Sequence, residues 1–101
     1  SPQAMEVLNN SVSELNVELQ KFQSNSTGTL ASYRDTGSGE TFNVSLYPIQ
    51  EINKMNITGA TKISYIKSNE NIYVLSVTGS LSPEKKNQIL QRANFFADQL
   101  K

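Results

Sequence analysis

The chain has 101 residues, of which 37% are hydrophobic and 18% charged, and its net charge is zero. This length predicts a single domain over residues 1–101 with one modest core, and the balanced charge argues against nucleic acid as the main partner. The chain contains neither Cys nor His, which excludes disulfides, thiolate zinc sites and cysteine nucleophiles and removes the commonest general base.

The first segment carries an apolar stripe at alternating spacings of three and four, which is typical of a heptad helix. We expect this helix to span residues 1–23 and to be ended by the polar run 24–28, with Gly28 as its left-handed cap. Two uses of the stripe stay open, packing within the domain and an interface with another helix, because the flanking positions are polar and nearly uncharged. This candidate interface or core seam consists of Met5, Leu8, Val12, Leu15, Leu19 and Phe22.

The next segment has the pattern of a β-hairpin. Residues 29–34 form its first run, and in the second run, residues 40–47, apolar and polar side chains alternate as in a strand with one solvated face. Between them Gly37-Ser38-Gly39 has the composition of a turn. A phosphate-binding loop would need to lead into a helix and carry a Lys, whereas this loop leads into a strand.

The second half repeats this organisation and then closes with a helix. Apolar residues at helical spacing after Pro48 predict one or two helical turns, and two further strands follow at residues 62–67 and 72–78. The second of these is apolar on both faces at its start, which predicts a central position in the sheet. Ser82 has the character of an N-cap, followed by a first helical residue at Pro83 and an amphipathic helix.

These elements predict an α+β fold with the order α-ββ-short α-ββ-α. The expected architecture is a four-stranded antiparallel sheet with helices packed on one face.

No set of residues with catalytic or ligand-binding spacing is present. The letters Ser-x-x-Lys occur twice, but the pair that begins at Ser64 lies in a predicted strand, where residues three apart point to opposite faces. The pair that begins at Ser82 uses a serine that is expected to cap a helix. We therefore expect no enzyme activity, no metal site and no cofactor.

The C-terminal half resembles a known family. A strand ends at Val77 and is followed by a Gly-small-x-Ser step, and the helix after it ends in a Phe/Leu-rich turn. This pattern is similar to the periplasmic domains of inner-membrane platform (fimbrial assembly) proteins of type IV pili and type II secretion systems. The resemblance covers roughly the last 45 residues and implies a ferredoxin-like fold, an upstream coiled-coil stalk, a membrane anchor and dimerisation. It rests on Val77, Gly79, Ser82, Phe96 and Leu100.

The resulting hypothesis is a non-enzymatic structural or assembly domain of a bacterial envelope machine, a pilus or secretion system, that acts through protein–protein contacts. Its expected partner is protein, either a second copy of the chain or a homologous subunit. Contact with the membrane is expected only through an upstream anchor, to which the N-terminal helix would connect. The abundance of Ser, Asn, Thr and Gln favours an extracytoplasmic location in the periplasm or cell envelope. The alternatives are the soluble head of a pilin-like subunit and a small ligand-binding domain.

Overall fold

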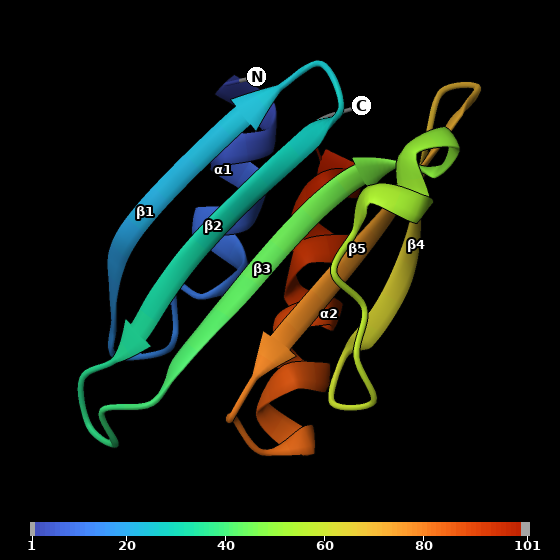
Figure 1. Ribbon diagram of the computed structural model, residues 1–101. Coiled ribbons are helices and arrows are strands. Elements are labelled where there is room, and N and C mark those ends of the chain that lie inside the picture. Colours follow the sequence, from blue (N-terminus) through green and yellow to red (C-terminus); the bar gives the residue numbers. More distant parts are fainter. Residues whose placement is uncertain (1, 100–101) are drawn as a thin grey trace.

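The computed structural model describes residues 2–99 of the chain. Within these residues one α-helix precedes a run of five strands and a second α-helix follows it, and a short 3-10 helix lies between the third and the fourth strand (Figure 1). In chain order the elements are α1 (Pro2–Ser11), β1 (Val17–Asn25), β2 (Gly28–Asp35), β3 (Thr41–Pro48), η1 (Ile49–Lys54), β4 (Lys62–Ser68), β5 (Asn71–Gly79) and α2 (Pro83–Gln99).

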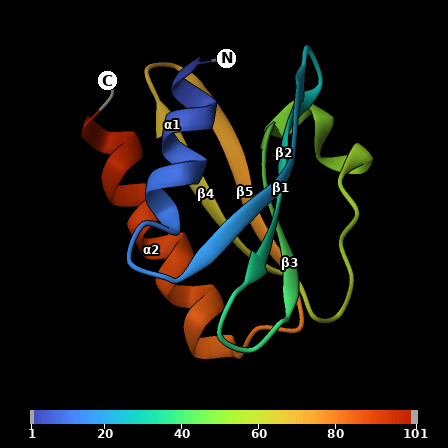
Figure 2. The same cartoon turned by 90° about the vertical axis from the view of Figure 1, so that its left-hand side faces the viewer.

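The strands form one antiparallel sheet in the order β1-β2-β3-β5-β4. The first three strands follow one another as a meander, and the β4–β5 hairpin is placed so that β5 lies beside β3. Figure 2 shows that α1 and α2 cover one face of the sheet, whereas η1 and the chain that leads from it to β4 lie on the other side. The expected central position of the strand at residues 72–78 is confirmed, because β5 has a neighbour on each side.

The core lies between the sheet and the two α-helices. Alternation along β2 and β3 directs Ala31, Tyr33, Phe42 and Val44 toward the helices, and all four are buried. The rings of Tyr33 and Phe42 stack with their centroids 5.5 Å apart. The Tyr33 hydroxyl donates a hydrogen bond to the side-chain oxygen of Asn9 at 2.9 Å, which ties β2 to α1. Burial raises the pKa of Tyr33 to about 12.

The last helix follows its sequence signals closely. Its first residue is Pro83, and the Ser82 hydroxyl accepts a hydrogen bond from the backbone N–H of Lys85 at 3.3 Å, so the predicted N-cap is confirmed. The apolar face of the helix enters the core as expected. Its buried residues include Ile89, Leu90, Ala93 and Ala97, whereas Leu100, also expected on this face, lies outside the described residues.

The prediction of one helix over residues 1–23 is wrong. The helix α1 ends at Ser11, and after a short turn the chain continues as β1 from Val17. At the end of α1 the Ser11 hydroxyl bonds to the carbonyl oxygen of Leu8, a local alternative that makes serine a poor residue for helix continuation. The heptad seam therefore does not exist as a continuous stripe on one helix.

A β-bulge explains why this strand has the spacing of a helix. Leu19 and Lys21 pair with consecutive residues of β2, so Gln20 is an extra residue in β1. Because of this bulge, Leu19 and Phe22 face the same side of the sheet although they are three positions apart. In the sequence, a strand with such a bulge has the same apolar spacing as one turn of a helix.

The polar run at residues 24–28 is a hairpin turn and not a helix end. The Asn25 side-chain oxygen accepts hydrogen bonds from the backbone N–H groups of Thr27 at 2.8 Å and Gly28 at 3.3 Å, which closes the turn between β1 and β2. Gly28 does not have the left-handed conformation of a helix cap. It is glycine because the Tyr47 ring lies across it, where a Cβ atom would come within 2.5 Å.

The predicted α+β class, the two hairpins and the antiparallel sheet are confirmed, but the sheet has five strands and not four. The additional strand is β1, whose residues the apolar spacing of the sequence places in the first helix. The element order is thus α-βββ-η-ββ-α. The ferredoxin-like order is not confirmed, because the first three strands are joined by turns with no helix between them.

Candidate functional site

The strand β4 forms one edge of the sheet, and its two faces have different surroundings. On the face toward the helices Ile66 is buried, and the Ser64 hydroxyl accepts a hydrogen bond from the Asn94 side chain of α2 at 2.7 Å. Because side chains alternate along a strand, Ile63, Tyr65 and Lys67 point to the opposite face. The inner contacts therefore fix which side chains β4 exposes.

We define the β4 surface as Ile63, Tyr65 and Lys67 of β4 together with Ile72 of β5. Ile72 pairs with Lys67 across the two strands and so shares their face. Tyr65 is 56% exposed, and Ile63 and Ile72 are each 40% exposed. Soluble proteins usually protect an edge strand with charged residues, bulges or proline. The strand β4 pairs with β5 without a register shift and directs an isoleucine and a tyrosine outward, with Lys67 as the one charged residue on this face.

The sequence-predicted seam residues are divided between the core and its margin. Leu8 and Val12 are buried, Leu15 and Phe22 are partly buried against the same core, and Met5 and Leu19 are about two-fifths exposed. Leu8 belongs to α1 and Val12 to the turn after it, whereas Leu19 and Phe22 belong to β1. These side chains contribute to packing with different degrees of burial and do not form one exposed interface.

The carboxylate with the clearest electrostatic environment is that of Asp35, the last residue of β2, beside the turn to β3. Asp35 accepts backbone hydrogen bonds from Gly37 at 2.9 Å and Ser38 at 3.2 Å, and Lys85 at the start of α2 lies 3.4 Å from its other oxygen. The Ser38 and Gly37 N–H groups, followed by Lys85, lower its pKa from the ordinary 3.8. The Gly37-Ser38-Gly39 segment is thus the predicted hairpin turn, and Asp35 connects it to α2.

A polar groove of about 270 Å³ lies on the face of the sheet opposite the α-helices. Several of its polar groups already bond to protein atoms: the Ser45 and Ser76 hydroxyls bond to each other, and the Thr78 hydroxyl bonds to Thr61 at 2.7 Å. Lys54 at its rim pairs with Glu51 at 3.0 Å. These bonds stabilise the open face of the sheet.

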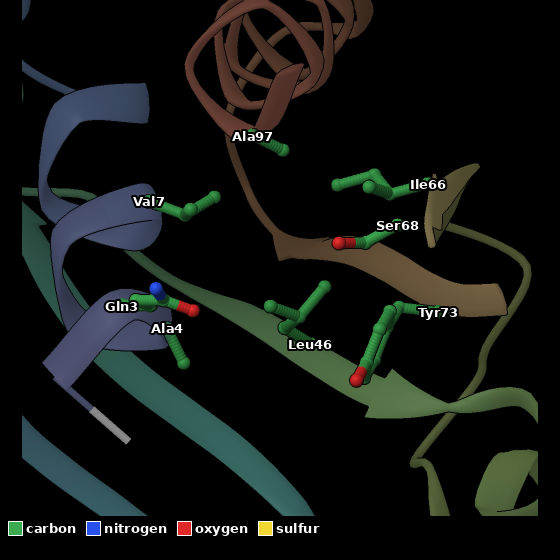
Figure 3. Close-up of a pocket in the computed structure, with 8 residues that line it drawn as sticks. All are labelled: Gln3, Ala4, Val7, Leu46, Ile66, Ser68, Tyr73 and Ala97. Carbon is green, nitrogen blue, oxygen red and sulfur yellow. The ribbon is translucent and has the colours of Figure 1, made fainter. Parts of the chain in front are cut away.

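A second, apolar crevice of about 130 Å³ lies between the two α-helices and the sheet. Figure 3 shows Val7 of α1 and Ala97 of α2 directed into the same space as Leu46 and Ile66 of the sheet. The groups that line it are mainly core side chains. Its shape reflects the space where the ends of α1 and α2 diverge.

The described part of the chain contains no group of three or more Asp and Glu side chains placed to hold a metal ion. Each Ser-x-x-Lys pair has the environment that the sequence predicts: Ser64 and Lys67 lie on opposite faces of β4, and Ser82 caps α2. Neither helix within residues 2–99 is long and apolar enough to cross a membrane.

Comparisons with known proteins add no relatives. No protein-family model matches the chain, and neither a curated protein nor a solved structure shows a significant match. The functional interpretation therefore depends on the geometry of the β4 surface and on the sequence pattern. The sequence predicts residues 62–67 as a strand but not as an edge of the sheet, because strand order depends on contacts between segments that are distant in the sequence.

Proposed function

We propose that this chain is a non-enzymatic protein–protein interaction domain of an extracytoplasmic bacterial envelope assembly, and that it binds its partner through the β4 surface. The observation that carries this proposal is the apolar, regularly paired edge at β4, with Tyr65 more than half exposed. An edge strand has unpaired backbone N–H and C=O groups that can pair with another strand, and exposed aromatic and aliphatic side chains add apolar contact area.

The cellular setting rests on the composition and on the sequence pattern. The polar composition and the absence of Cys are compatible with the envelope. The strand that ends at Gly79 and the Ser82-capped helix resemble those of pilus and secretion platform proteins, and a role in such a machine is part of the proposal. It does not depend on a ferredoxin-like strand order.

Site-specific photocrosslinking in the source bacterium tests the contact. A benzoylphenylalanine in place of Tyr65 keeps an aromatic ring at the β4 surface, and the same residue in place of Gln23 on β1 is the matched control at the other sheet edge. We expect a protein adduct from position 65 that is several-fold stronger than from position 23. No adduct from position 65, or equal adducts from both positions, would refute the proposed contact.

Protease accessibility tests the location separately. In cells whose outer membrane has been opened, an extracytoplasmic chain is degraded by added protease while a cytoplasmic marker stays intact. Protection of the chain together with the marker would refute the extracytoplasmic location. The contact through the β4 surface would still be decided by the crosslinking experiment.

A further inference from the structure

We infer that the occupant of the β4 surface is a second copy of this chain, with the two β4 strands paired antiparallel about a twofold axis at Tyr65. This inference rests on the proposed function of β4 as a contact surface. The two sheets would join into one continuous sheet, with the α-helices of both copies on the same face. Isologous pairing of this kind closes after two copies and uses one surface twice.

The order of residues along β4 suits antiparallel self-pairing. With Tyr65 opposite Tyr65 of the second copy, Ile63 lies opposite Lys67 and Ser64 opposite Ile66, so no two like charges are paired directly. In a parallel, in-register arrangement Lys67 would lie opposite Lys67, which is unfavourable. The charge pattern therefore selects the antiparallel arrangement.

Charges at the two ends of β4 complement each other in the same arrangement. Lys62 begins the strand, and Glu70 lies in the turn just beyond its end. Antiparallel pairing about Tyr65 places Lys62 opposite Ser68 of the second copy, the last residue before the two-residue turn that contains its Glu70. The Lys62 ammonium and this carboxylate therefore lie at the same end of the junction, where opposite charges attract. The twofold axis repeats this arrangement at both ends.

The apolar side chains become continuous across the same junction. The two Tyr65 rings lie side by side on the face away from the α-helices, with Ile63 of each copy beside the aliphatic stem of Lys67 of the other. The opposite edge is a poor alternative partner for β4, because the bulge at Gln20 interrupts the register of β1.

A charge exchange at the axis tests the arrangement directly. In Tyr65→Lys two ammonium groups would meet at the axis, and in Tyr65→Glu two carboxylates would meet. We expect each variant alone to dimerise at least about tenfold more weakly than the wild type in sedimentation equilibrium, and the equimolar mixture to recover a 1:1 dimer, because opposite charges then meet. Unchanged circular dichroism of each variant verifies its fold.

Disulfide trapping measures the register independently, since the wild-type chain has no Cys. Tyr65→Cys should form a disulfide-linked dimer under mild oxidation, because Cα atoms of directly opposed residues lie within disulfide reach. Ile63→Cys and Lys67→Cys should crosslink efficiently when mixed but not alone. Lys21→Cys on β1 is the matched control and should stay monomeric.

The outcomes separate this inference from the proposed function. A wild-type chain that stays monomeric at submillimolar concentration, or a mixture of Tyr65→Lys and Tyr65→Glu without recovered dimer, overturns self-pairing. An adduct of Tyr65 in cells with a different protein also overturns it, while it supports the β4 surface as a contact. An adduct with twice the mass of the chain supports both.

Discussion

The two edge strands of the sheet, β1 and β4, differ in the regularity of their pairing and in the side chains on the face away from the α-helices. The strand β1 is interrupted by a bulge at Gln20 and carries the charged residues Glu18 and Lys21 on the face away from the α-helices. The strand β4 pairs without interruption and carries Ile63 and Tyr65, with a single charged residue, Lys67, on that face. Bulges and charges are devices that prevent an edge from pairing with another strand.

The two edge strands also differ in how deeply their inward apolar side chains are buried in the core. Ile66, the inward apolar residue of β4, is buried, whereas Leu19, an inward residue of β1, is 41% exposed. The edge without a bulge is thus the one whose inward apolar residue is more deeply buried. This combination is expected of a strand that serves as a rigid template for a partner.

Truncation of the two inward residues gives the largest expected difference between the edges. Ile66→Ala should lower the free energy of unfolding by about 2–5 kcal/mol, because it removes buried methyl groups and leaves a cavity. Leu19→Ala should cost less than about 1.5 kcal/mol, since a large part of that side chain is already in water. Urea denaturation of both variants measures the difference. Equal losses would contradict the firmer attachment of β4.

Removal of the bulge tests whether it protects the β1 edge. Deletion of Gln20 keeps Leu19 and Phe22 on the helix-facing side, now two positions apart as in a regular strand. We expect the fold to persist and the β1 edge to become available for pairing. In a Tyr65→Lys background, which weakens association through β4, the deletion should increase self-association several-fold in sedimentation velocity. Association as weak as in Tyr65→Lys alone would show that the bulge is not the protecting device.

The same bulge marks the limit of what the sequence predicts about the fold. From residue 29 onward the strands, the short helix and the Ser82 cap are all recognisable, because period-two alternation and turn residues are local signals. Between residues 12 and 25 the bulge produces a helical spacing inside a strand. Local patterns there favour a heptad helix, and only pairing with β2 shows otherwise.

The candidate site could be predicted only in part. The sequence identifies residues 62–67 as a strand, but both of its faces contain an isoleucine, Ile63 on one and Ile66 on the other. Which face is covered depends on α2, through the contact between Asn94 and Ser64. Which strand lies at the edge depends on the insertion of β5 beside β3, a non-local property of the chain.

The end of β2, against which β1 begins, has a pH-dependent contribution from Asp35. Its native pKa is lowered from 3.8, so the unfolded chain takes up a proton first and stability falls as the pH drops through 3.8 and then through the native pKa. The contribution is complete at neutral pH. Asp35→Asn should lower the thermal midpoint at pH 7, and the difference from wild type should shrink between pH 5 and pH 2. The control variant Glu6→Gln removes an exposed carboxylate of α1.

The smallest effect is expected at the ion pair that crosses the β1–β2 hairpin. Arg34 and Glu18 approach to 3.0 Å, but their side chains are 37% and 57% exposed, and pairs in water contribute little because solvent screens them. Glu18→Gln should therefore change the free energy of unfolding by less than about 0.5 kcal/mol, and a double-mutant cycle with Arg34→Gln should give a coupling of similar size. A coupling above about 2 kcal/mol would mean that charge, and not the packing of Phe22 and hairpin pairing, holds β1 to the sheet. The charges of β1 would then be structural, and the contrast with β4 would rest on the bulge alone.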